Sequence, residues 1–146
     1  MYPCAREPKQ EMRTNRRERV GTLLMQTLAR RFLPEVESAS AAREFVGAAV
    51  RDTGIDRDEA LLLTSELVNN AILHAHSDFE VRVDFDDFDA LCVSVVNHSP
   101  ELLPLSREPS SFGGRGLSIV DRLANAWGFE SQGDAKWVWF RLASSS

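Results

Sequence analysis

Cysteine is scarce in this 146-residue chain, which contains only Cys4 and Cys92. Two cysteines supply neither a disulfide framework nor the ligands of a zinc site, so we predict no structural role for either one. No apolar run approaches the roughly 18 residues that cross a bilayer. The segment from Met1 to Arg19 is polar and charged, unlike a secretory signal. These absences predict a cytoplasmic protein that contacts no membrane.

Charge is distributed unevenly around a net value of −5. Residues 1–31 hold eight of the 17 basic residues but only three of the 22 acidic ones, so this segment carries +5 and the remainder −10. The basic segment lacks interleaved aromatic residues and the acidic remainder would repel phosphates, which argues against direct nucleic-acid binding. We interpret residues 1–31 as a flexible basic leader, 32–142 as one domain and 143–146 as a disordered tail.

Hydrophobic residues make up 43% of the chain and charged residues 27%, as in soluble globular proteins. Helical periodicity predicts three helices: from Ser38 or Ser40 to Thr53-Gly54, from Asp56 or Asp58 through Ala75, and from Leu117 to Trp127. Shorter or alternating apolar runs predict strands at 32–36, 79–85, 90–96, 129–131 and 136–142. Adjacent strands with few crossover helices indicate an α+β fold: a two-layer sandwich whose mostly antiparallel sheet is covered on one face by three helices.

A polar stripe runs along the second predicted helix, where Glu66, Asn70 and His74 follow one another at four-residue spacing. This spacing places them on one face, about 6 Å apart per step. A carboxamide oxygen from Asn70 suits Mg²⁺, which prefers oxygen ligands and often shares them with substrate phosphates. Glu66 would then serve as a base for an attacking hydroxyl or water. Taken alone, the stripe is better explained as a solvated helix face with a local hydrogen bond.

A glycine cluster precedes the third predicted helix. Gly113, Gly114 and Gly116 would let a phosphate approach the backbone N–H groups at a helix start, and Arg115 would add a positive charge. The cluster is not a P-loop, because the Lys-Ser/Thr pair is absent and no parallel strand precedes it. A flexible hinge is the alternative interpretation. Two phosphate signals in one small domain nevertheless favour a nucleotide site.

Four segments together resemble, in order and spacing, the GHKL ATP-binding domain shared by gyrase, histidine kinases and MutL. The resemblance is greatest to the stand-alone bacterial anti-sigma factor serine kinases and covers residues 32–142. The segments are ELVNNAILHA (66–75), VVNHSP (95–100), GGRGLSIVDRLANAWG (113–128) and KWVWFRL (136–142). The resemblance implies a Bergerat-type sandwich with ATP and Mg²⁺ as cofactors.

The resemblance also implies roles for individual residues. Glu66 matches the catalytic carboxylate, Asn70 the magnesium ligand, and His74 the end of the motif beside the nucleotide. The segment that closes over the phosphates is matched by Gly113, Gly114, Arg115, Gly116 and Leu117.

Two positions depart from the family pattern. Relatives usually have an aspartate at Asn97, where it accepts a hydrogen bond from the adenine amino group. A carboxamide oxygen still accepts this bond, but the loss of charge weakens it by about 1 kcal/mol. Ser99, followed by Pro100, stands where many relatives have a glycine, a variant associated with the stand-alone branch.

Three functions follow as hypotheses. The first is a regulatory switch that binds a sigma factor and/or phosphorylates an anti-anti-sigma factor on Ser or Thr, with a homodimer possible because relatives often dimerise. The second is a binding module without kinase activity, whose nucleotide site is degenerate at Asn97. The third, a histidine-kinase fragment, is disfavoured because 146 residues leave no separate phosphoacceptor domain and the leader contains no histidine.

Overall fold

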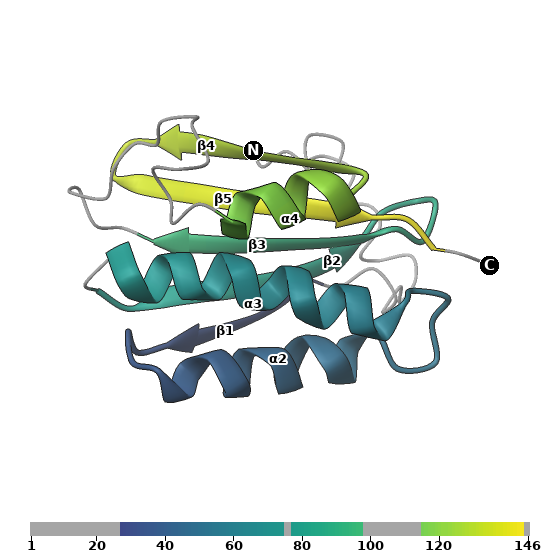
Figure 1. The fold of residues 1–146 in the computed structure, drawn as a ribbon, viewed down its shortest axis with the longest axis horizontal. Helices are drawn as coiled ribbons and strands as arrows, with labels where there is room; N and C mark the ends of the chain where they lie inside the picture. Colours follow the sequence, from purple (N-terminus) through teal and green to yellow (C-terminus); the bar gives the residue numbers. More distant parts are fainter. Residues whose placement is uncertain (1–26, 75–76, 98–114, 145–146) are drawn as a thin grey trace, which may run out of the picture.

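The computed structural model describes residues 27–74, 77–97 and 115–144. These residues form five strands and three helices (Figure 1). In chain order the elements are β1 (Leu28–Phe32), α2 (Glu37–Ala49), α3 (Arg57–His74), β2 (Phe79–Phe85), β3 (Leu91–Asn97), α4 (Arg115–Leu123), β4 (Ala126–Gln132) and β5 (Ala135–Leu142).

The five strands form one sheet in the order β1-β2-β3-β5-β4, and every neighbouring pair is antiparallel. Figure 1 shows α2, α3 and α4 side by side over the same face of this sheet. This arrangement confirms the predicted α+β sandwich, including the helices on one face.

The core lies between the sheet and the helices because the strands alternate in character. In β2 the side chains of Phe79, Val81 and Val83 are buried, whereas those between them are only partly so. The register places Val81 opposite Val95, and Val95 opposite Val138 on β5. Residues directly opposite share a face, so these rows of apolar side chains all point toward the helices. The alternation predicted for 79–85 is therefore confirmed.

Helix α3 begins as its sequence predicts. The backbone N–H of Glu59 donates to Oδ1 of Asp56 at 3.1 Å, so Asp56 caps the first turn. The helix then packs against α2 and α4 as well as β3 and β5. Its central position in the helical layer explains why Leu63 and Leu67 are almost completely buried.

The first strand is displaced from its predicted position at 32–36. Strand β1 comprises Leu28–Phe32, so residues 28–31, which we assigned to the leader, form the edge of the sheet. Phe32 stacks on Phe79 of β2, with ring centroids 5.6 Å apart. Pro34 has no backbone N–H to donate, which is consistent with the strand ending before it rather than continuing through it.

The boundaries of α2 also differ from the prediction. The helix begins at Glu37, and Ser38 is not its cap: the Ser38 hydroxyl donates to the Leu33 carbonyl at 2.7 Å. The helix ends at Ala49 rather than at Thr53-Gly54. Thr53 instead closes the following turn, where its hydroxyl donates to the Val50 carbonyl at 2.6 Å.

The third helix is shorter than predicted at its C-terminal end. Helix α4 ends at Leu123, and Trp127 belongs to β4, which begins at Ala126 rather than at 129. The β4–β5 hairpin turns at Gly133, which has a φ of 63° that favours glycine. None of the helices in the described part of the chain is long and apolar enough to cross a membrane.

Candidate functional site

The proposed catalytic carboxylate and magnesium ligand lie on α3. Glu66 and Asn70 are both partly exposed, whereas Leu67 and Ala71, which directly follow them, are buried. Four residues correspond to about 6 Å along a helix, so the two polar groups lie one turn apart on the open side of α3. The helix ends at His74, the third residue of the predicted stripe.

Asn97 is the last residue of β3 and is 3% exposed. It lies opposite Phe79 on β2 and opposite Lys136 on β5. Because Phe79 belongs to the core, Asn97 also faces the helices. Burying a carboxamide costs free energy unless it is hydrogen-bonded. A carboxamide at the end of the central strand therefore marks this end of the sheet as a candidate polar site.

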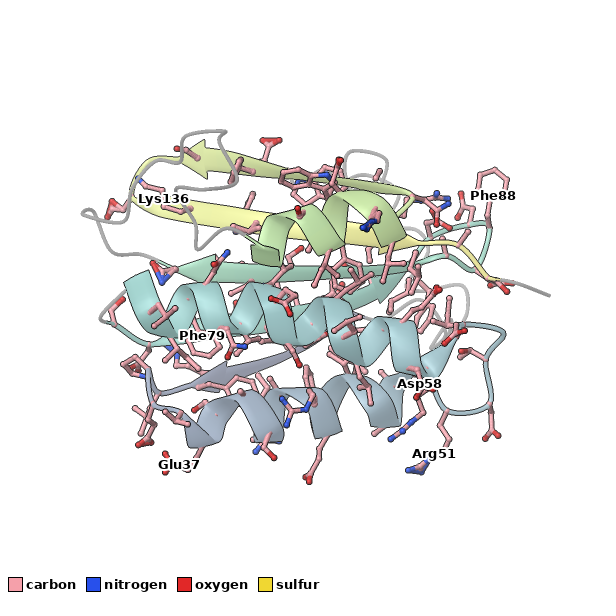
Figure 2. All side chains as sticks on the ribbon, viewed as in Figure 1. Glu37, Arg51, Asp58, Phe79, Phe88 and Lys136 are labelled. Carbon is pink, nitrogen blue, oxygen red and sulfur yellow. The ribbon has the colours of Figure 1, made fainter. Side chains whose placement is uncertain are left out.

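These residues gather at one end of the molecule. In Figure 1 the arrowhead of β3 and the last turn of α3 point toward the same end, and α4 starts on that side. Figure 2 labels Phe79 and Lys136, the two cross-strand neighbours of Asn97, at this end as well. The structure therefore brings the C-terminal half of α3 and Asn97 to the same end of the sandwich.

The structure adds Lys136 to the residues that sequence analysis singled out. Its side chain lies in the same row as Asn97, on the helix-covered face of the sheet, and is partly buried. Strand alternation was the available signal, because Lys136 is two residues before Val138, which packs against the core. The alternation is present in the segment KWVWFRL itself, independently of the family resemblance that this segment carries.

The glycine cluster is described only in part. Helix α4 starts at Arg115, so Arg115, Gly116 and Leu117 belong to its first turn, rather than the helix starting at Leu117. Gly113 and Gly114 lie outside the described residues, as do Ser99 and the rest of the predicted loop. Helix α4, in which Arg115, Gly116 and Leu117 form the first turn, packs against α3.

The carboxylate of Glu66 and the carboxamide of Asn70 are oxygen donors of the kind that would suit Mg²⁺. No group of three or more His, Cys, Asp or Glu side chains that could hold a metal ion occurs within residues 27–74, 77–97 and 115–144. Asn70 and Glu66 supply one carboxamide and one carboxylate on neighbouring turns. Mg²⁺ commonly takes one or two such side chains and completes its octahedron with waters and substrate phosphates.

The opposite end of the sheet carries a different polar group. Asp86 follows β2 and accepts hydrogen bonds from the backbone N–H groups of Phe88 and Ala90 at 2.8 and 3.0 Å. It also forms an ion pair with Arg141 of β5 at 2.8 Å. Burial raises the pKa of Asp86, but these bonds outweigh it and lower the pKa below its usual value. Figure 2 shows Phe88 at the end of the molecule away from Lys136, so Asp86 is a structural group outside the candidate site.

Residues 32–142 match the family described as the histidine kinase-like ATPase domain. The protein belongs to this family, because the match covers most of the chain. The resemblance deduced from the four sequence segments is thereby confirmed. Comparison with curated proteins finds no match.

Several solved structures share the fold. The RsbU and RsbW domains of Rv1364c from Mycobacterium tuberculosis superpose with a TM-score of 0.60 at 14% identity, over 81% of this chain. That match spans only 32% of the Rv1364c structure. A SiaB–SiaC complex from Pseudomonas aeruginosa gives a TM-score of 0.54 at 13% identity, over 93% of this chain and 100% of that one. The Acinetobacter baumannii histidine kinase AdeS gives 0.51 at 13% identity, over 94% and 77%.

Proposed function

We propose that this protein is an ATP-binding regulatory switch of the anti-sigma factor kinase type. It binds a sigma factor and/or an anti-anti-sigma factor, and it transfers the γ-phosphoryl group of ATP to a Ser or Thr hydroxyl of that antagonist. Family membership over residues 32–142 supports nucleotide binding. The likeness to a structure of RsbU and RsbW domains and to one of a SiaB–SiaC complex supports a partner protein.

The single observation that carries this proposal is the placement of Glu66 and Asn70. They occupy successive turns on the open side of α3, in the segment that belongs to the ATPase family. A helix that packs against α2, α4 and the sheet has little free surface. A carboxylate and a carboxamide on that remaining surface have the chemistry needed for phosphoryl transfer.

The division of labour follows from the side chains. Asn70 would hold Mg²⁺ through its carboxamide oxygen, and the ion would neutralise charge on the phosphates. Glu66 accepts the proton of the acceptor Ser or Thr hydroxyl. The hydroxyl oxygen bonds to the γ-phosphorus while the bond between the γ-phosphorus and ADP breaks. Asn97 accepts a hydrogen bond from the adenine amino group. Arg115 and the backbone of Gly113, Gly114, Gly116 and Leu117 contact the phosphates, with His74 and Ser99 beside the nucleotide.

Thermal unfolding with ATP, in the presence and absence of magnesium, tests this function. A ligand at about 100 times its dissociation constant adds roughly 2.7 kcal/mol, which raises the midpoint of a domain this size by several degrees. We expect the increase with ATP to depend on magnesium. A Glu66→Gln variant should keep this stabilisation but lose ADP formation and phosphorylation of added candidate antagonist proteins.

The second candidate function is a binding module without kinase activity. Asn97 favours it, because this residue stands where a charged acceptor for adenine is usual. The same experiment separates the two functions: no shift at millimolar ATP and magnesium would reject the switch and leave the binding module.

A further inference from the structure

The face of the sheet opposite the helices carries an unusual strip on two of its three inner strands, β3 and β5. It consists of Cys92, Ser94 and Val96 of β3 with Trp137 and Trp139 of β5, and we call it the outer strip. Val96 lies opposite Trp137, and Ser94 lies opposite Trp139. Figure 1 shows all three helices on the other face, so the outer strip has no part in the core between sheet and helices.

The β3 residues of the outer strip are as buried as the core. Cys92, Ser94 and Val96 are only 1%, 2% and 2% exposed. No described helix or strand lies over them, whereas the uncovered face of a two-layer sandwich is normally in contact with water. Their burial therefore indicates that another piece of protein covers this face.

Trp139 gives independent support for such a cover. Its indole lies against Gly128 of β4, where a Cβ atom would be 3.1 Å from Cζ2 of the ring. The indole Nε1 atom is buried, and it finds no hydrogen-bond acceptor among the described residues. A buried tryptophan N–H usually has a partner, so the covering piece is expected to supply an acceptor here.

The chain itself provides a segment of suitable length at this place. Residues 1–26 precede Thr27, whose hydroxyl donates to Asp84 on β2. Asp84 lies opposite Cys92, so the segment joins the sheet at the edge of the row that contains Cys92. The distance from β1 to β5 is three strand spacings, about 14 Å, which about five extended residues span. Residues 1–26 are more than long enough to cross the outer strip.

The composition of this segment matches the surface. Val20, Leu23, Leu24 and Met25 provide apolar side chains for the tryptophans. The six basic and three acidic residues of the segment give it a charge of +3, whereas the domain that follows the leader is acidic. Glu130, which lies opposite Trp137, flanks the outer strip with a carboxylate, whereas Glu80, opposite Val96, is ion-paired with Arg82 at 2.8 Å. Apolar contact and opposite charge thus favour the same arrangement.

The two cysteines support the same arrangement. Cys92 is disulfide-bonded in the structure, and Cys4 is the one other cysteine of the chain. This corrects the expectation that neither cysteine has a structural role. We propose that residues 1–26 dock on the outer strip, cover Trp137 and Trp139 and bring Cys4 to Cys92. The leader is then an intramolecular cover, independent of whether the nucleotide site is active.

Tryptophan fluorescence of the full chain tests this docking. A Trp127→Phe background removes the one tryptophan that lies on the helix-covered face, so the emission reports on the outer strip alone. In this background we compare the parent with a Leu23→Asp/Leu24→Asp variant, both under reducing conditions. The leader variant should show red-shifted emission and stronger quenching by iodide. A Thr14→Asp/Thr22→Asp variant adds the same charge to the leader without removing apolar side chains, and it should resemble the parent.

Circular dichroism establishes that all three proteins are folded. Equal quenching in the parent and in the Leu23→Asp/Leu24→Asp variant would overturn the proposal, because the leader would then not cover the tryptophans. Mass spectrometry of the non-reduced full chain supplies the second readout. A Cys4–Cys92 link within a monomer supports the proposal. A Cys92–Cys92 link between chains, with a dimer in sedimentation, would show that a second copy covers the strip instead.

Discussion

The indole Nε1–H of Trp127 donates a hydrogen bond to Oδ1 of Asp121 at 3.0 Å. This bond joins β4 to the last turns of α4, and the Trp127 ring also packs edge-on against Phe129, with centroids 5.8 Å apart. Helix α4 begins with Arg115 and Gly116, which the proposed function places at the phosphates. The anchor at one end of α4 therefore helps to fix the orientation of the end that would contact ligand.

Trp127→Phe should lower the free energy of unfolding by about 1 kcal/mol, because it removes this hydrogen bond and part of the packed ring. Urea unfolding monitored by circular dichroism measures the change. Asp121→Asn keeps an acceptor oxygen and should cost less. A loss in Asp121→Asn as large as that in Trp127→Phe would contradict this expectation, because the carboxamide oxygen would then not replace the carboxylate as acceptor.

Asp86→Asn should lower the free energy of unfolding at neutral pH by about 1–2 kcal/mol, since it weakens the bonds to Arg141 and to the turn. The pKa of Asp86 is lowered in the folded state, so its stabilisation is complete above the unfolded value of about 3.8 and is lost as pH falls through the folded value. The difference between parent and variant should therefore shrink in acid. Urea titrations from about pH 7 to about pH 2 measure it.

Asp87→Asn is the matched control for this experiment. Asp87 is the next residue of the same turn and is exposed. The control should follow the parent at every pH. A constant difference between the parent and Asp86→Asn throughout the titration would contradict an origin in the carboxylate charge.

Asn70→Ala should abolish the magnesium-dependent part of ATP stabilisation and leave the fold intact. The truncation removes the carboxamide oxygen from the open side of α3, while alanine is a good helix former. Differential scanning fluorimetry with ATP, with and without magnesium, measures both effects. Asn69→Ala, at the exposed neighbouring position of the same helix, should behave like the parent. Unchanged magnesium dependence in Asn70→Ala would place the metal elsewhere.

Asn97→Asp should strengthen ATP binding by about 1 kcal/mol, or roughly fivefold, by restoring a charged acceptor for the adenine amino group. The same change should lower stability without nucleotide, because the position is 3% exposed and a buried charge is costly. Lys136, directly opposite, offsets part of that cost. Isothermal titration calorimetry and ligand-free thermal unfolding measure the two effects. Unaltered affinity would indicate that residue 97 does not contact the base.

The sequence predicts the layers of this fold well because period and composition change clearly along the chain. The alternation of residues 79–85 and the start of a helix near Asp56 both follow from local sequence, and both are confirmed. The incorrect strand assignment arises where a contact with residues distant in sequence determines the secondary structure. Residues 28–31 have no apolar alternation, and they are a strand because β2 offers an edge with which to pair.

The candidate site was predictable to a similar extent. The spacing of Glu66 and Asn70 predicts a shared face from helix geometry alone, and α3 places them on it. The position of Lys136 opposite Asn97 depends on the register between β3 and β5, and this pairing joins residues far apart in the chain. The burial of Ser94 and Val96 on the outer face was not predicted, although the nearly continuous apolar run LCVSVV at 91–96 is typical of a strand buried on both faces.

The order of the strands also has a kinetic consequence. The β2–β3 and β4–β5 hairpins each pair residues close in sequence, whereas the β3–β5 pairing that unites them joins distant segments. Local hairpins close within microseconds, but distant pairings are slower because they restrict more of the chain. Asn97 and Lys136 lie opposite each other in the β3–β5 pairing. Partly folded chains can therefore hold both hairpins and still lack the end of the sheet that carries Asn97 and Lys136. Under the proposed function, ATP binding would require the β3–β5 pairing in addition to the two hairpins.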